Sequence, residues 1–355
     1  MSVVIVHSSG SFFGITLVGG TLAVQLFYVI SGFLITLVVG DKYQITWRGL
    51  WLFYSNRYLR IWVPYIVVAV ATFLYMKVSP LLGGVSLGGS TAISLKHLMY
   101  LDAFSVLSII LLNILIFGQD IGMLLAHDID IGIYFSMSAM TEPKPFYQFY
   151  IMDQTWTLGI ELSFYLIAPF IVRRRVWFIV FIMLISICFR LFVYEMGLNF
   201  DPWTYRFFPF ELAFFMAGSL ACKAYIYINK LNIKEDILRY IGYVAIIAVV
   251  LWQFVDKTRV SNIVLFFIVV PTLPMLFAAT KDISWDRFLG DLSYPLYLVH
   301  IPIILIFRSH PFLSEKIGTN VYVVLPLSFL AAWLICIKIE QPLEKIRQNR
   351  LLKKS

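Results

Sequence analysis

The sequence predicts an all-α protein, a bundle of about ten helices that cross a membrane, with one further helix that re-enters the membrane or lies on its surface. Of the 355 residues, 60% are hydrophobic and 14% are charged, whereas soluble domains are about one quarter charged. A chain this apolar needs lipid as the solvent for most of its surface. Its long apolar runs lack the two-residue alternation of barrel strands, which favours helices.

About ten apolar runs have the length of a membrane span, since roughly 20 apolar residues cross the hydrocarbon core as a helix. The run at residues 103–117 is shorter, and we expect a re-entrant or interfacial helix there. We expect a single membrane domain over residues 1–343, followed by a basic cytoplasmic tail over residues 344–355. The expected spans are residues 1–18, 21–40, 61–78, 156–172, 176–194, 206–226, 238–255, 260–279, 289–309 and 321–338.

The formal net charge of +8 would suggest nucleic-acid binding in a soluble protein. Here the basic residues occupy short loops between apolar runs, as the positive-inside rule expects, so we expect no nucleic-acid partner. Ten spans place these loops on one side of the membrane, which we expect to be cytoplasmic, together with both termini. The basic clusters are Arg57 with Arg60, Arg173–Arg175, Lys230 with Lys234, Lys281 with Arg287, and the tail from Lys345 to Lys354.

The longest polar stretch of the chain is residues 118–155. It is either a docking place for a substrate on the outer side or a solvated connector between membrane helices. Its charged and polar residues include Gln119, Asp120, His127, Asp128 and Asp130.

Four ionisable residues lie inside apolar runs, namely His7, Glu161, Glu211 and His300. Ionisable groups at membrane depth are costly, so each is a candidate functional residue. A neutral imidazole can act as a general base near neutral pH, and a carboxylate can orient it or hold an arginine. The alternative for each residue is a position at the membrane interface, where polar side chains are tolerated.

Arg57 and Arg60 are three residues apart, so they share one face of a helix. Guanidinium groups bind phosphates in a bidentate manner, which suits a phosphorylated, nucleotide-bearing donor at the membrane surface. Ordinary positive-inside anchoring is the alternative for this pair. Ser31 and Gly32 lie in mid-helix and predict close helix packing. A nucleophilic role for Ser31 would need an adjacent base, and none is visible in the sequence.

Five segments, in this order along the chain, resemble the signature motifs of the acyltransferase-3 family of integral membrane O-acyltransferases. The resemblance extends over almost the whole chain, and the order of the motifs makes it specific. The segments are LFYVISGFLIT (26–36), NRYLRIWVPY (56–65), WTLGIELSFYLIAP (156–169), GDLSYPLYLVHIP (290–302) and IEQP (339–342).

The resemblance implies an O-acetyltransferase that uses acyl-CoA, commonly acetyl-CoA, on the cytoplasmic side of a bacterial inner membrane. Its acceptor would be a hydroxyl of a cell-surface polysaccharide or a lipid-linked glycan, and no metal is expected. Arg57 and Arg60 would contact the CoA phosphates. His7 would be central to acyl transfer, with Glu161 and His300 completing the polar interior.

Two departures from the family pattern stand out. The family carries an arginine eleven positions before its first-helix histidine, whereas six residues precede His7. We therefore expect the first helix to be N-terminally truncated, with the natural start upstream. Many relatives carry an acidic residue where this chain has Gln25, and its loss removes a charge that could orient His7. The alternative functions are a secondary transporter or flippase of a glycan or lipid, and an inactive truncated relative.

Overall fold

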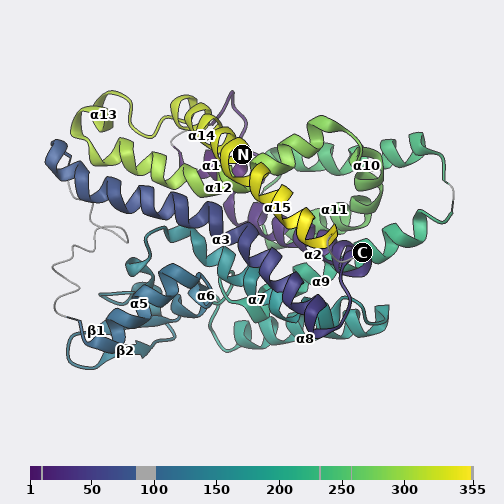
Figure 1. Cartoon of the computed structure of the whole chain (residues 1–355), viewed down its shortest axis with the longest axis horizontal. Coiled ribbons are helices and arrows are strands. Elements are labelled where there is room, and N and C mark those ends of the chain that lie inside the picture. The colour runs from purple at the N-terminus through teal and green to yellow at the C-terminus, as the bar shows by residue number, and fades with distance from the viewer. Residues whose placement is uncertain (9–10, 85–100, 232, 257, 353–355) are drawn as a thin grey trace.

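The computed structural model of the chain describes residues 1–8, 11–84, 101–231, 233–256 and 258–352. These residues form the expected all-α bundle (Figure 1), with one antiparallel hairpin of β1 (Leu125–Asp128) and β2 (Gly132–Phe135). The helices are α1 (Ser2–His7), α2 (Gly20–Lys42), α3 (Trp47–Val78), α5 (Ala103–Leu115), α6 (Gln119–Gly122), α7 (Trp156–Ile171), α8 (Val176–Glu195), α9 (Phe208–Ile228), α10 (Glu235–Leu251), α11 (Arg259–Thr280), α12 (Ser284–Ser309), α13 (Pro311–Lys316), α14 (Val321–Ile335) and α15 (Gln341–Leu352).

Within the described chain, 8 helices are long and apolar enough to cross a membrane, so the protein is an integral membrane protein. They lie at eight of the ten expected positions. The expected span at 156–172 is α7, which has 16 residues and is shorter than the roughly 20 that a perpendicular span needs. The remaining expected span is residues 1–18.

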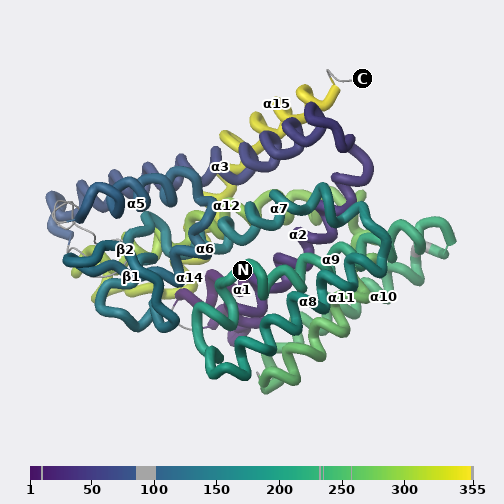
Figure 2. The backbone as a smooth tube through the Cα atoms, turned by 90° about the horizontal axis from the view of Figure 1, so that it is seen from below, coloured from purple at the N-terminus to yellow at the C-terminus, as the bar shows by residue number. Residues whose placement is uncertain are grey.

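The expected span at residues 1–18 is not one helix. The first helix, α1, ends at His7, and Phe12 and Ile15 then pair in an isolated bridge. Gly14 and Gly19 have φ of +75° and +87°, conformations that interrupt a right-handed helix and that glycine adopts readily. The N-terminus lies about midway along the horizontal axis of the molecule in both views (Figures 1 and 2).

The arginine pair Arg57 and Arg60 lies inside α3, where a loop was expected before the span at 61–78. This helix has 32 residues and is about 48 Å long, so it extends well beyond a hydrocarbon core of about 30 Å. The Thr46 side chain caps its first turn by accepting a hydrogen bond from the backbone N–H of Gly49 (3.1 Å). The pair therefore has a rigid helical support.

Two glycines allow α2 and α9 to approach closely, as the Ser31-Gly32 pair predicts. A Cβ atom at Gly32 would collide with the backbone of Phe215, and one at Gly218 with the carbonyl of Val29. The Thr36 hydroxyl lies 2.9 Å from that of Ser219 across the same contact. Small residues at helix crossings provide the van der Waals contact that holds membrane helices together.

We expect Gly32→Ala to destabilise the bundle by about 2 kcal/mol or more, because the added methyl group has no space between two backbones. Gly40→Ala is the matched control on the same helix, since a Cβ at Gly40 meets nothing within 4 Å. Thermal unfolding in detergent measures both variants. Equal melting temperatures for the two variants would contradict close packing at Gly32.

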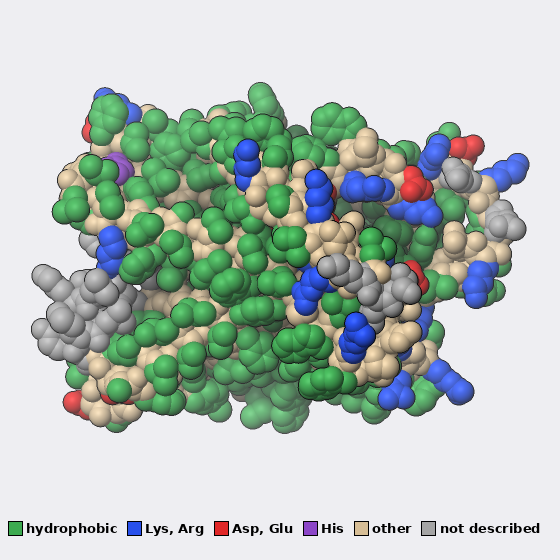
Figure 3. All heavy atoms as spheres, in the orientation of Figure 1, with side chains coloured by type: hydrophobic (Ala, Val, Ile, Leu, Met, Phe, Trp, Pro, Cys, Tyr) green, Lys and Arg blue, Asp and Glu red, His purple; other side chains and the backbone are tan. Residues whose placement is uncertain are grey.

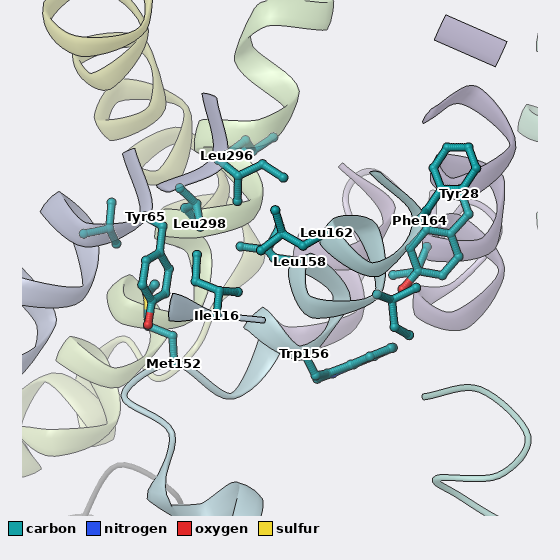
Figure 4. Close-up of a cluster of buried hydrophobic side chains, with 14 of the residues drawn as sticks. Tyr28, Tyr65, Ile116, Met152, Trp156, Leu158, Leu162, Phe164, Leu296 and Leu298 are labelled. Atoms are coloured by element: carbon teal, nitrogen blue, oxygen red, sulfur yellow. The ribbon is translucent and has the colours of Figure 1, made fainter. Parts of the chain in front are cut away.

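The apolar core of the bundle surrounds α7, most of whose residues are buried. Figure 4 shows Leu158 and Leu162 of α7 close to Leu296 of α12. Phe164 of α7 and Tyr28 of α2 both stack on Phe215 of α9, with ring centroids 4.3 and 4.8 Å away. Contacts with α2, α3 and α9 enclose the remaining sides of α7. The core therefore holds α7 at the centre of the bundle, where a polar side chain on it must find its partners inside the protein.

The segment after residue 100 forms a folded unit and not a loose connector. The short apolar helix expected at 103–117 is α5, and Asp102 caps it by accepting from the backbone N–H of Ser105 (3.0 Å). Trp62 and Tyr65 of α3 hold its other end, since Trp62 donates to the carbonyl of Ile114 (2.8 Å) and Tyr65 to that of Asn113 (2.5 Å). The β-hairpin and three short 3-10 helices, Ala139–Thr141, Phe146–Phe149 and Asp153–Thr155, complete the unit.

The chain continues as a helix beyond its last apolar run. After α14, a π-helical turn (Cys336–Glu340) leads directly into α15. Residues 344–352, expected as a tail, therefore form a helix, and it runs beside α3 (Figure 2). Residues 353–355 of the expected tail lie outside the described residues.

Lysine and arginine side chains gather on the side of the molecule where α10 and α15 lie, at the right of Figure 3. We refer to this side as the basic end. Arg173 is part of it and has a structural role, because its guanidinium donates to the carbonyls of Val39 and Tyr43 at the end of α2. These contacts satisfy backbone carbonyls that a helix end leaves free.

Candidate active site

The structure brings His7 and His300 together, although 293 positions separate them in the sequence. Nδ1 of His7 lies 3.0 Å from Nε2 of His300, and the two rings are nearly parallel, with an angle of 5° between their planes. His300 is fully buried on α12, whereas His7 at the end of α1 is exposed. The pair thus joins a buried imidazole to an accessible one.

A backbone hydrogen bond of His300 determines which ring nitrogens of this pair carry a proton. Nδ1 of His300 lies 2.7 Å from the carbonyl oxygen of Tyr297, and because a carbonyl only accepts, Nδ1 carries the proton. In neutral rings, Nε2 of His300 then accepts from Nδ1–H of His7. This arrangement leaves the lone pair of Nε2 on His7 free, which is the group that a base or a nucleophile needs.

Tyr297 is itself held by the start of α7. Its hydroxyl donates to the carbonyl of Gln154 (2.7 Å) and accepts from the Thr157 hydroxyl (2.8 Å). The Gln154 amide donates to the carbonyl of Leu298 (3.1 Å). The turn of α12 that carries His300 is therefore fixed by direct hydrogen bonds to the central helix.

Glu161 belongs to a second group of polar residues. Its Oε1 accepts from the hydroxyl of Ser31 (3.0 Å) on α2 and from the hydroxyl of Tyr165 on α7. Among the described residues, neither His7 nor His300 interacts with Glu161. A cavity of about 60 Å³, which we call the inner cavity, lies beside this carboxylate. The polar side chains that line it are Ser31, Arg57, Arg60, Glu161, Tyr165 and Tyr294.

Arg57 and Arg60 both reach this inner cavity, as their helical spacing predicts. Arg57 is only 5% exposed, and its Nε has no hydrogen-bond partner among the residues that the structure describes. Arg60 is half-buried and also lines a second cavity of about 420 Å³, the outer cavity, between α3, α12 and α15. A buried guanidinium with an unused donor is a strong anion-binding group. Arg60 therefore links the inner and outer cavities, while Arg57 lines the inner one.

Residues of α12 lie between the arginine pair and the histidine pair. Tyr294, Tyr297 and His300 follow at intervals of three residues, so each is a neighbour of the next on the helix. Tyr294 lines the inner cavity and donates to the carbonyl of Ile61 on α3 (2.6 Å). The rise of an α-helix places His300 about 9 Å further along the axis than Tyr294.

Glu211 takes part in packing between α2, α8 and α9. Its Oε1 lies 3.3 Å from Nη1 of Arg190 and accepts from the amide of Gln25 (3.4 Å). Gln25 does not contact His7 within the described chain. A carboxylate at position 25 would face a second carboxylate on Glu211, so the amide suits this environment.

Some contacts of the candidate residues could not be predicted from the sequence. No base for Ser31 was visible there, and the carboxylate that the fold places beside it, Glu161, is 130 positions away. Tyr165 follows Glu161 by four residues, and Tyr297 precedes His300 by three. These helical spacings were visible signals that both tyrosines neighbour a candidate residue.

The polar residues at 118–155 divide into buried and exposed groups. Gln119, Asp120 and His127 are buried, whereas Asp128 and Asp130 are exposed. Gln119 accepts from the hydroxyl of Thr155 (2.7 Å) and donates to the carbonyl of Leu112 (3.0 Å), which ties α5 to the start of α7. That this stretch docks a substrate stays a prediction.

Burial raises the pKa of Asp120 to about 6. Because this folded-state pKa lies above the unfolded value of about 3.9, the favourable contribution to folding is complete below about pH 4 and is lost as the pH rises through about 6. We expect Asp120→Asn to raise the melting temperature at pH 8 and to leave it unchanged at pH 4. The exposed Asp130→Asn is the control, and a difference that does not vary with pH would contradict the assignment.

Comparison with protein-family models assigns the chain to a family. A family model described as an acyltransferase domain, the acyltransferase-3 model, matches residues 1–337. No curated protein and no solved structure matches the chain. The matched residues include both cavity arginines, the buried carboxylate and the histidine pair, and they exclude α15.

Proposed function

The chain belongs to the acyltransferase-3 family and is a membrane acyltransferase, and we propose that it moves an acetyl group from cytoplasmic acetyl-CoA to a hydroxyl of a cell-envelope polysaccharide or lipid-linked glycan. The observation that carries this proposal is the arrangement along α12. The inner cavity, lined by two arginines, lies beside Tyr294, and His300, which holds the accessible His7 through a hydrogen bond, lies about 9 Å further along the same helix.

The donor enters from the basic end, which we assign to the cytoplasmic side of a bacterial inner membrane. Arg57 and Arg60 bind the phosphates of CoA, because Nε of the buried Arg57 has no partner among the described residues and Arg60 lies one turn further along the same helix. The inner cavity beside Tyr294 and Glu161 is a path for the pantetheine arm toward the histidines. Glu161 lines this cavity together with both arginines, and its bonds to Ser31 and Tyr165 fix that carboxylate in place.

Nε2 of His7 is the reacting atom. In one route it attacks the thioester carbonyl, the C–S bond breaks, and CoA leaves as the thiolate; the acceptor hydroxyl then attacks the acyl carbon, the C–N bond breaks to free Nε2, and the hydroxyl proton passes to the thiolate. In the other route Nε2 removes the proton of the acceptor hydroxyl, whose oxygen attacks the thioester; the C–S bond breaks, and the leaving CoA thiolate takes the proton from Nε2. His300 keeps the His7 ring oriented in both routes, since Nδ1–H of His7 donates to it.

Ligand binding and transport assays separate this function from the transporter alternative. We expect acetyl-CoA or CoA to raise the melting temperature of the purified protein in neutral-lipid nanodiscs, because a ligand that binds only the folded state stabilises it. Glycan or lipid flux that follows a substrate gradient without CoA, together with no stabilisation by CoA, would contradict the proposal.

A further inference from the structure

Arg347 is a buried arginine in a part of the chain that the family model does not reach. It lies on α15 and is 9% exposed. Its Nη1 forms an ion pair with Glu344, one turn earlier on the same helix (2.6 Å), while its Nε has no hydrogen-bond partner among the described residues. The guanidinium is thus held in place with one donor unused.

This arginine lines the outer cavity, the space of about 420 Å³ that also contains Arg60. The volume is several times that of the inner cavity and lies in the range of small-molecule sites. Four basic side chains line it against three acidic ones. The basic residues are Arg60, Arg287, Lys345 and Arg347, and the acidic residues are Asp291, Glu340 and Glu344.

The position of α15 is fixed by contacts with α3. Arg350 donates from Nη1 to the side-chain oxygen of Asn56 and from Nη2 to the hydroxyl of Ser55, both over 2.9 Å. Asn56 directly precedes Arg57 in α3. Arg347 lies one turn before Arg350, and it experiences the charges of both Arg57 and Arg60. The two side chains of Arg60 and Arg347 line the same cavity, so the helix places a further guanidinium beside Arg60.

The lining of the outer cavity carries one more basic than acidic side chain, and Nε of Arg347 is a buried donor without a partner among the described residues, so the site favours an anion. We propose that Arg347 is a third phosphate-binding arginine, and that the outer cavity takes the phosphorylated nucleotide end of the donor. This inference rests on the proposed function, because it places the nucleotide next to Arg60, from which the pantetheine arm continues into the inner cavity. Glu344 orients Arg347, and Arg350 fixes the helix.

The test measures binding of adenosine 3′,5′-bisphosphate, the phosphorylated nucleotide without the pantetheine arm, by calorimetry on the full chain in neutral-lipid nanodiscs. We expect Arg347→Gln to weaken binding by about 10-fold to 100-fold, the effect of losing a hydrogen bond to a charged group. Lys338→Gln is the matched control, because Lys338 is exposed on the preceding π-helical turn and lines neither cavity. We expect wild-type affinity for it.

A second measurement separates binding from folding. We expect Arg347→Gln to transfer acetyl groups from acetyl-pantetheine, which lacks the nucleotide, at the wild-type rate, while its KM for acetyl-CoA rises. If Arg347→Gln does not fold, Arg347→Lys keeps the charge without the planar fork and should weaken binding to a lesser extent. Wild-type nucleotide affinity in a folded Arg347 variant overturns this inference alone. If the wild-type protein binds neither the nucleotide nor acetyl-CoA, the proposed function is overturned as well.

Discussion

Replacing His7 with alanine is expected to reduce acyl transfer by about 100-fold to 10,000-fold, the range that a positioned acid–base group contributes. His7 is the accessible member of the histidine pair, and Nε2 of its neutral ring holds the lone pair that both routes require. Because the His7 side chain is exposed, its loss leaves no buried cavity, and we expect the fold to stay intact. The rate of label transfer from acetyl-CoA in membrane vesicles measures the effect.

His310→Ala is the control for this substitution. His310 lies between α12 and α13, and its ring contacts Tyr75 edge-on, away from the histidine pair. We expect His310→Ala to transfer label at the wild-type rate. If His7→Ala retained more than about one tenth of the wild-type rate, the catalytic role of His7 would be wrong.

The double substitution of Arg57→Gln and Arg60→Gln is expected to raise the KM for acetyl-CoA by at least about 100-fold, since each charge-assisted bond to phosphate contributes about 1.5–3 kcal/mol. We expect a smaller change in kcat, because the phosphates are far from the reacting carbonyl. Initial rates over a range of acetyl-CoA concentrations give both values.

The control removes two positive charges from the same end of the molecule without changing a cavity. Lys42→Gln with Arg48→Gln serves this purpose, because both side chains are exposed near the loop between α2 and α3. If the two double variants showed the same KM, the arginine pair would act only through the general positive charge of the surface.

The helices and the arginine pair could be predicted because their signals are local. Long apolar runs fix where a helix must lie in lipid, and the spacing of Arg57 and Arg60 places both on one face of α3. The prediction of one membrane-spanning helix over residues 1–18 was wrong for a physical reason. Helix α1 ends at His7, and the positive φ angles of Phe13, Gly14 and Leu17 are incompatible with a right-handed helix in the rest of this segment, although its composition is apolar.

The partners of the site residues could not be predicted, because they depend on contacts between distant segments. The histidine pair joins α1 to α12, and the contact of Ser31 with Glu161 joins α2 to α7. Helix α15 is polar, and its sequence contains no apolar run that would predict a packed helix. It is held by hydrogen bonds from Arg350 to α3, which no local pattern in the sequence predicts.

The central claim is that His7 passes an acetyl group from a donor on the basic side to an acceptor hydroxyl. The most direct measurement uses inverted inner-membrane vesicles, in which the cytoplasmic face is outside, supplied with acetyl-labelled acetyl-CoA. We expect label to enter glycan or lipid with the wild-type chain and not with His7→Ala at equal protein level. Label incorporation that is the same in both, or that occurs only when acetyl-CoA is supplied on the opposite face, would contradict the account.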